Sequence, residues 1–357
     1  MRRFSLCLLI LGVSVAGCGS DTGSGASAGD FDWPPDATAH FDEYGILNAD
    51  CATDEDCAMM LGYYHSFDRF VQMDIRRRFS TGRLADILPT SLAGLLADDF
   101  ADLRALFSTR DGVPAEQFLY DQSSPKTKAL LDAYTVGVNK WIEDMQNGEN
   151  GAEFPRELMH RALVYSPDDV PPWEPTDSVA AVLALIENLT NDDSAQIRAA
   201  AAREAIDDDV KFSDLWSRRP LEESSILPLD WVPPPPPDAA EKRLPPVALR
   251  RPALRERLDI APVIERLHAK LERTIDLRTM ILGPGVIGDE IGSNNWVLAP
   301  TRTSAGNALL SNDPHLGMTQ PATWYLAHLD AVTNGRGEIH AAGMTFAGLP
   351  WVLIGQN

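Results

Sequence analysis

The segment "GDEIGSNNWVLAPTRTSAGNALLSNDPHL", residues 288–316, contains the residues of this chain best suited to chemistry. Ser293 follows a glycine, and a serine hydroxyl becomes a nucleophile when a base takes its proton. The segment closes on an acid, a proline and a histidine in "NDPHL". Taken alone, Ser293 is also typical of a strand start after a glycine turn, and "NDPHL" of a hairpin turn with a capping aspartate. Motifs in the rest of the sequence are needed to choose between these interpretations.

The composition is that of an acidic globular protein. Hydrophobic residues make up 44% and charged residues 23% of the 357 residues, which is ordinary for a folded chain. The formal net charge is −21, and the basic runs at 76–78 and 250–251 are short. Because this charge repels phosphates, the composition argues against a nucleic-acid partner.

The N-terminus resembles an export and anchoring signal. Residues 1–17 place Arg2 and Arg3 before an apolar run that is too short to span a bilayer. The run ends in "VAGC", which is similar to a bacterial lipobox and implies cleavage before Cys18 and lipidation of its thiol. Residues 18–39 would be a flexible tether. The expected location is beyond the inner membrane, lipid-anchored at the outer membrane and facing the periplasm or the surface. An ordinary signal peptide is the alternative.

The cysteines of the mature chain form one candidate pair. Cys7 leaves with the signal and Cys18 takes lipid, so Cys51 and Cys57 of "CATDEDC" remain. An oxidising compartment favours a small-loop disulfide between them. A metal site is the weaker alternative, because two thiols at this spacing lack the usual further ligands.

Three long helices are predicted from periodicity and capping signals. Apolar residues recur every three or four positions in "DEDCAMMLGYYHSFDRFVQMDIRRRFS", a helix that Gly82 ends or bends. A second helix starts at Ser124 and stops at Gly148. A third runs through "PWEPTDSVAAVLALIENLT", and its expected cap is Asp177 or Ser178.

The composition changes twice after the mainly helical region, residues 40–216. Residues 217–292 contain five consecutive prolines and are expected to be a Pro-rich spacer or propeptide. From Ser293 onward, short apolar segments are divided by Gly, Asn and Pro, which predicts strands over residues 293–357.

Five motifs in order resemble the penicillin acylase family of N-terminal nucleophile hydrolases. "DEYGI" resembles the opening strand of that family, and "LGYYHSFDRFVQMDIRRRFSTGRLADIL" resembles its long helix. "AYTVGVNKWI" and "PWEPTDS" match later helical signatures, and "GSNNWVLAPTRTSAGNALLSNDPHLG" matches the start of the catalytic chain. The resemblance covers most of residues 40–215 and 283–357.

The resemblance implies an α+β fold with the family's αββα core, incomplete here, and a mainly helical N-terminal chain. It implies self-cleavage between Gly292 and Ser293, with Gly292 in a turn, to give an α/β heterodimer. The α-amine of Ser293 would then serve as the base for its own hydroxyl. The implied reaction is amide hydrolysis of a small-molecule N-acyl substrate, such as a β-lactam side chain, through an acyl-Ser293 intermediate. The only membrane contact expected is the lipid anchor.

The resemblance also assigns roles around Ser293. Asn294 lies next to it, and the backbone of His315 would orient substrate, while a structural role for His315 stays open. Trp296 is expected in the core. The acyl pocket is expected near Leu185, Leu189, Leu316 and Ile354, and core packing is the alternative for each of them. An ion-paired network between the two chains is expected from His65, Asp68, Arg69, Gln72, Asp74, Arg77 and Arg78.

Two departures from the family pattern bear on these expectations. No cofactor is implied for catalysis, and in place of the family's calcium glutamate this sequence offers Asp192, Asp193 or Gln196, which leaves a structural calcium open. The family's catalytic chain continues well past the position of Asn357, and both oxyanion donors are expected in that later part. The alternative function is therefore a truncated, catalytically inactive member or a surface lipoprotein.

Overall fold

The fold was analysed in a computed structural model of the chain. The structure describes Pro34 and residues 36–159, 163–190, 292–316 and 320–357, together with the isolated positions Ala202, Ile206, Lys211 and Phe212. The predicted signal peptide, Cys18, the tether, the Pro-rich spacer, Asp192 and Asp193 lie outside the described residues. All the helices and strands named below belong to one compact unit of the chain.

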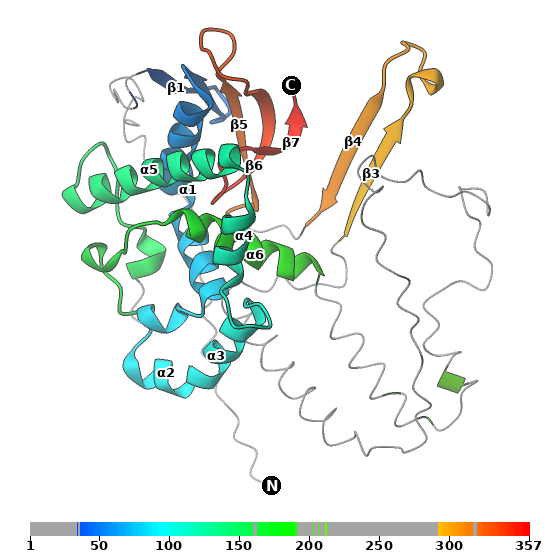
Figure 1. The fold of residues 1–357 in the computed structure, drawn as a ribbon. Coiled ribbons are helices and arrows are strands. Elements are labelled where there is room, and N and C mark those ends of the chain that lie inside the picture. The colour runs from blue at the N-terminus through cyan, green and yellow to red at the C-terminus, as the bar shows by residue number, and fades with distance from the viewer. Residues whose placement is uncertain are drawn as a thin grey trace. The chain divides into compact units, whose positions relative to one another are not determined.

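A five-stranded sheet joins the two ends of the described chain (Figure 1). Its strands, in spatial order, are β1 (Ala37–Phe41), β2 (Leu47–Cys51), β5 (Trp324–Asp330), β6 (His340–Phe346) and β7 (Val352–Gln356). β2 and β5 pair in parallel, and the other neighbours are antiparallel. Asn48 and His328, which face each other across β2 and β5, are 280 residues apart in the sequence.

Strand alternation gives this sheet one buried, apolar face and one more exposed face. Leu47, Ala49 and Cys51 are buried on β2, whereas Asn48 and Asp50 between them are only half-buried. Successive side chains of a strand point to opposite faces, so the buried set lies on one side. The apolar face packs against helices, and the expected α+β fold class is confirmed.

Capping residues set the limits of the longest helix, α1 (Asp54–Thr81). Thr53 accepts a hydrogen bond from the backbone N–H of Asp56 and satisfies one of the free donors of the first turn. Gly82 ends the helix in the left-handed conformation, with φ of 69°. The predicted stop at Gly82 is confirmed, because glycine adopts this conformation without a Cβ clash.

The second helix also follows its sequence signals. α5 (Pro125–Asn147) has Ser124 as its N-cap, and the Ser124 side chain accepts the backbone N–H of Thr127. Gly148 ends it in the left-handed conformation, with φ of 70°. Both predicted limits are confirmed, and proline in the first turn costs no hydrogen bond.

The third predicted helix begins earlier than expected. α6 runs from Pro175 to Thr190, so neither Asp177 nor Ser178 is its cap. The Asp177 carboxylate instead accepts the backbone N–H of Glu174, a contact that reaches back from the first turn. Shorter helices complete the region: α2 (Thr90–Leu95), α3 (Ala97–Leu106), α4 (Ala115–Gln122), and 3₁₀ turns at Leu84–Ile87, Arg156–Met159, Pro167–Asp169 and Pro300–Arg302.

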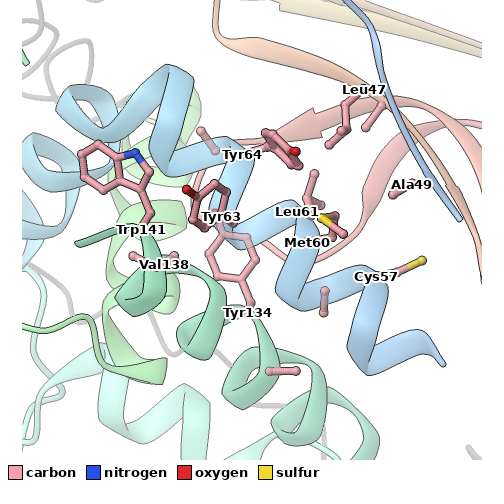
Figure 2. Close-up of a cluster of buried hydrophobic side chains, with 14 of the residues drawn as sticks. Leu47, Ala49, Cys57, Met60, Leu61, Tyr63, Tyr64, Tyr134, Val138 and Trp141 are labelled. Atoms are coloured by element: carbon pink, nitrogen blue, oxygen red, sulfur yellow. The ribbon is translucent and has the colours of Figure 1, made fainter. Parts of the chain in front are cut away.

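The main core lies where α1 packs on α5 and on the sheet (Figure 2). Figure 2 shows Leu61 and Tyr63 of α1 together with Tyr134, Val138 and Trp141 of α5, and all five side chains are buried. Aromatic side chains dominate this contact, so each removes a large area from water. The sheet therefore packs on the α1–α5 pair.

A disulfide links the sheet to helix α1. Cys51 at the end of β2 is bonded to Cys57 in the first turns of α1, with a Cα–Cα distance of 5.4 Å. Both thiols are buried, and both are consumed by the bond. The structure thus contains the small-loop disulfide that the spacing predicts, and a metal site at these two residues has no thiolate left to use.

Two glycines allow α1 and α5 to approach closely. A Cβ added to Gly137 would lie 2.0 Å from the carbonyl oxygen of Met59, and one added to Gly62 would lie 2.3 Å from that of Tyr134. These contacts are with backbone atoms of the facing helix, which cannot rotate away. The crossing therefore requires glycine at both positions.

Gly137→Ala is expected to destabilise the chain by about 3 kcal/mol or more, because relieving the clash must separate two helices. Gly94→Ala is the matched control, because this α2 glycine has nothing within 4 Å of an added Cβ. The control should be neutral or stabilising by up to ~1 kcal/mol. Urea unfolding measures both variants, and equal midpoints would contradict the close-approach argument.

A second, two-stranded sheet carries Ser293. β3 (Gly292–Leu298) pairs antiparallel with β4 (Leu309–His315). Trp296, expected in a core, is 65% exposed. That expectation is wrong for the described structure, because two strands alone cannot bury either of their faces. Among the described residues, no helix is both long and apolar enough to cross a membrane.

Candidate active site

The pairing of β3 with β4 places the predicted site residues beside one another. Gly292 lies opposite His315, Ser293 opposite Pro314, and Asn294 next to Ser293 on the same strand. The turn expected at Gly292 is wrong, because Gly292 is already the first residue of a strand. The alternative interpretation of "NDPHL" as a hairpin turn is also wrong, because most of this motif belongs to β4 and pairing with β3 holds it extended.

Ser293 and the side chain of His315 lie on opposite faces of this hairpin. Residues paired directly across two strands share a face, and neighbours along a strand alternate. The Ser293 face therefore carries Ser293, Asn295, Val297, Leu310, Asn312 and Pro314. None of these side chains titrates near neutral pH. Within β3 and β4, no side chain can serve as a base on the face of the Ser293 hydroxyl.

The opposite face of the hairpin carries the acid and the histidine of "NDPHL". His315 Nε2 lies 2.9 Å from Asp313 Oδ2, and both side chains are largely exposed. This pair holds the imidazole over its own strand, turned away from Ser293. The backbone of His315 remains close to the Gly292–Ser293 peptide, which is compatible with the substrate-orienting role suggested by the sequence.

The four predicted pocket residues come from separate elements. Leu185 is half-buried on α6, Ile354 is half-buried on β7, and Leu316 directly follows β4. Leu189 is also on α6, but its side chain lies outside the described residues. Neither apolar cluster in the described part of the chain contains any of the four. The acyl pocket stays a prediction.

A polar cavity of about 320 Å³ lies where α1, α4 and α6 meet. Four of its charged side chains form ion pairs, Arg83 with Asp177 at 2.7 Å and Arg104 with Glu116 at 2.9 Å. The full lining is Thr81, Arg83, Arg104, Pro114, Glu116, Gln117, Glu174, Thr176 and Asp177. None of these residues belongs to the predicted pocket, and the polar lining does not suit an acyl chain.

A buried histidine joins the helices to the sheet that follows the hairpin. His65 of α1 is fully buried, with Nδ1 2.9 Å from Tyr134 Oη and Nε2 2.8 Å from Thr345 Oγ1. The Thr345 hydroxyl donates to the Tyr325 carbonyl at 2.8 Å, so its oxygen accepts from His65 Nε2–H. Nδ1 is then unprotonated and accepts from Tyr134, whose oxygen accepts the Gly348 N–H. His65 is therefore neutral and fully hydrogen-bonded.

The burial of neutral His65 is expected to make the folded chain less stable in mild acid. Burial, assisted by the charge of Arg69, lowers the pKa of His65 to about 3 from its usual 6.5. Between these values only the unfolded state binds the proton, so stability falls as the pH drops below 6.5. The loss is about 1.4 kcal/mol per pH unit down to pH 3. Urea titrations at pH 7, 6 and 5 should show this extra loss relative to His65→Gln, and identical pH slopes would contradict it.

A buried ion network fixes the C-terminal half of α1. Asp74 accepts from Arg77 Nε at 2.7 Å and from Arg78 Nε at 2.9 Å, and the Tyr165 hydroxyl donates to it at 3.0 Å. Arg77 also contacts Asp177 of α6 at 2.8 Å. Burial opposes ionisation of Asp74, but the charges of Arg77 and Arg78 outweigh it and lower the pKa of Asp74. The network therefore stays charged and ties α1 to α6.

Contacts between α1 and the strands after the hairpin differ from the ion-paired network expected across the two chains. Asp68 accepts from the Tyr325 hydroxyl at 2.8 Å, and the Arg69 guanidinium lies 5.5 Å from the centre of the Tyr325 ring. Lys126 of α5 forms an ion pair with Glu338 at 2.5 Å, and both side chains are exposed. The described ion pairs of Asp74, Arg77 and Arg78 all lie within the helical region, because their partners come from α1, α6 and the loops beside them.

Comparisons with known proteins identify the family of the chain. A sequence model of the penicillin amidase family matches residues 36–357. An acyl-homoserine lactone acylase of Pseudomonas fluorescens Pf0-1 is 26% identical over 309 residues, covering 85% of this chain and 31% of the relative. Penicillin acylase 2 proenzyme of Pseudomonas sp. SE83 is 26% identical over 324 residues, covering 87% and 33%.

Solved structures include a similar chain. A thermostable penicillin G acylase from Alcaligenes faecalis, in a tetragonal form, shares 19% sequence identity with a TM-score of 0.43, over 54% of this chain and 96% of that chain. The chain spans about a third of the length of the first relatives it matches, 31% for the Pseudomonas fluorescens acylase. The match to the family model covers both the helical region and the Ser293 hairpin. The chain belongs to the penicillin amidase family, whose members are amide-hydrolysing acylases.

Proposed function

We propose that this chain is the precursor part of an N-terminal nucleophile acylase, activated by cleavage of the Gly292–Ser293 peptide bond. The observation that carries the proposal is the composition of the Ser293 face. On that face, Ser293 has a nucleophilic hydroxyl and an extended backbone. No side chain of the hairpin that titrates near neutral pH lies on the same face. Cleavage before Ser293 would create a base, the freed α-amine, on the residue itself.

The chemistry of the freed amine suits this role. An α-amino group has a pKa of about 8, so a useful fraction is neutral near pH 7. It takes the hydroxyl proton as Ser293 attacks the substrate carbonyl, and returns that proton to the leaving amine. Water then hydrolyses the acyl-serine ester by the same route. General-base assistance of this kind contributes roughly 10²- to 10⁴-fold.

The proposed substrate class is an N-acyl compound with a hydrolysable amide. The named relatives include acyl-homoserine lactone acylases and penicillin acylases, and both kinds of substrate contain such an amide. Leu185, Leu189, Leu316 and Ile354 are proposed to contact the acyl group. Cleavage would leave an α/β heterodimer. The contacts of His65 and the five-stranded sheet, whose strand β2 ends at Cys51, would hold its two chains together.

Export and lipidation complete the proposal. Cleavage before Cys18 and acylation of its thiol would place the folded part outside the inner membrane, on the tether of residues 18–39. Cys18→Ser should move the protein from the detergent-soluble membrane fraction to the soluble fraction without changing cleavage at Ser293. A Cys18→Ser protein that stays in the membrane fraction would argue against the lipid anchor.

Mass spectrometry of an acylated intermediate tests the proposed reaction. The expressed gene product is mixed with a penicillin and, separately, with an acyl-homoserine lactone, and quenched in acid. The expected product is a peptide beginning at Ser293 whose mass is increased by the acyl group. Cleavage at Ser293 without acyl transfer from either compound to Ser293 would favour the inactive alternative. Acyl transfer to another residue would overturn the assignment of the nucleophile.

A further inference from the structure

A cluster of two histidines and an aspartate lies on the face of the five-stranded sheet that is opposite the α1 core. His328 and Asp330 are two residues apart on β5, so their side chains point to the same face. His340 of β6 is paired directly with Asp330 and shares that face. The alternate residues of β5, including Leu329, are buried against the helices. The cluster therefore lies away from the α1 core and belongs to neither strand of the Ser293 hairpin.

The three side chains converge. One ligand atom from each of His328, Asp330 and His340 can be chosen so that all three lie within 4.8 Å of one another. His340 Nε2 is 3.9 Å from Asp330 Oδ2, and the two imidazole rings have centroids 5.7 Å apart. Tetrahedral zinc with bonds of about 2.0–2.1 Å requires ligand atoms about 3.4 Å apart. The His340 side chain is 53% exposed, so a rotation about its own bonds can close the difference.

The carboxylate is held in place by the turn that follows β5. Asp330 Oδ1 accepts the backbone N–H groups of Val332 at 2.9 Å and Thr333 at 2.8 Å. The second carboxylate oxygen of Asp330 faces His340.

The imidazole of His328 has an orienting partner on the next strand. His328 Nδ1 lies 3.3 Å from Asn48 Oδ1, and the two residues face each other across β2 and β5. Histidines that bind metals commonly donate their other ring N–H to such an oxygen, which fixes the ring and its tautomer. With Nδ1 directed at Asn48, Nε2 of His328 is left as the metal-binding atom.

We propose that His328, Asp330 and His340 form a binding site for a divalent transition-metal ion, with Zn²⁺ as the preferred ion. Two imidazoles and one carboxylate suit zinc, whereas calcium and magnesium prefer all-oxygen sites. The three residues leave one coordination position for water or another ligand. The site bridges β5 and β6 and is independent of the proposed acylase chemistry at Ser293.

Isothermal titration of the purified gene product with Zn²⁺ tests this site. The expected result is one zinc ion bound per chain at these residues, with at least a tenfold loss of affinity in His340→Gln and in His328→Gln. Calcium and magnesium should not compete at equal concentration. His40→Gln is the matched control, because His40 is an exposed histidine of β1 in the same sheet but outside the cluster. Its zinc affinity should be unchanged.

A spectroscopic readout separates metal binding from a folding defect. Cobalt substituted for zinc should give visible absorption bands from nitrogen and oxygen ligation, lost in the His328→Gln/His340→Gln double variant while its circular dichroism remains native. Zinc binding of equal affinity and stoichiometry in the wild type and this double variant would overturn the proposal. Failure of the wild type to bind Zn²⁺ at millimolar concentration would overturn it as well.

Discussion

Replacing Ser293 by alanine is expected to leave the gene product uncut and to abolish its amide hydrolysis. The hydroxyl of Ser293 is the only side-chain nucleophile on its face of the hairpin, so no neighbour on β3 or β4 can take over. Loss of a nucleophilic serine in hydrolases costs roughly 10⁶-fold in rate. Here the loss would be greater in practice, because the α-amine that acts as base is not released either. Electrophoresis and an acyl-release assay measure the two effects.

Two variants control this result. Ser311→Ala removes another serine of the same hairpin, from the exposed β4 strand, and should leave both cleavage and hydrolysis unchanged. Ser293→Cys keeps a nucleophile in place and should retain cleavage, since a thiol can attack the preceding carbonyl. If Ser293→Ala were cleaved normally, the proposed nucleophile would be wrong even if the chain were an active hydrolase.

Asp74→Asn is expected to destabilise the folded chain by about 3–5 kcal/mol, because it leaves two buried guanidinium groups without their shared counter-charge. Asp74 is fully buried between Arg77 and Arg78, at 2.7 Å and 2.9 Å. An asparagine also presents an N–H group to one of these donors, which cannot accept it. Chemical unfolding measures the change.

The comparison that isolates burial is Asp86→Asn. Asp86 contacts the same arginine, Arg78, at 3.3 Å, but its side chain is 58% exposed. Exposed ion pairs contribute between 0 and about 1 kcal/mol, so this variant should unfold near the wild-type midpoint. Similar losses for Asp74→Asn and Asp86→Asn would show that the buried network does not hold α1 to α6.

The helices were predictable because their signals are local. Caps such as Ser124 and left-handed glycines such as Gly82 and Gly148 act within one turn, so neighbouring residues suffice to place the helix limits. The cap predicted at Asp177 was wrong because that prediction also used only local signals. Its polar side chain resembles a cap, whereas its actual partners include Arg77, which is 100 residues away in the sequence.

The long-range features could not be predicted from the sequence. The parallel pairing of β2 with β5 depends on which strands the folded helices bring together, and strand periodicity does not state a partner. The His328–Asp330–His340 cluster was missed for that reason. The alternation in "HLD" places two of its members on one face, but only the β5–β6 register adds His340. The exposure of Trp296 likewise depends on what packs over a hairpin.

N-terminal sequencing of the purified gene product tests the central claim most directly. Two polypeptides are expected after expression, and the second should begin with the residues Ser-Asn-Asn-Trp, from Ser293 to Trp296. The same preparation of Ser293→Ala should contain one uncut polypeptide. A wild-type product that remains a single chain, or whose second polypeptide begins at another residue, would contradict the account.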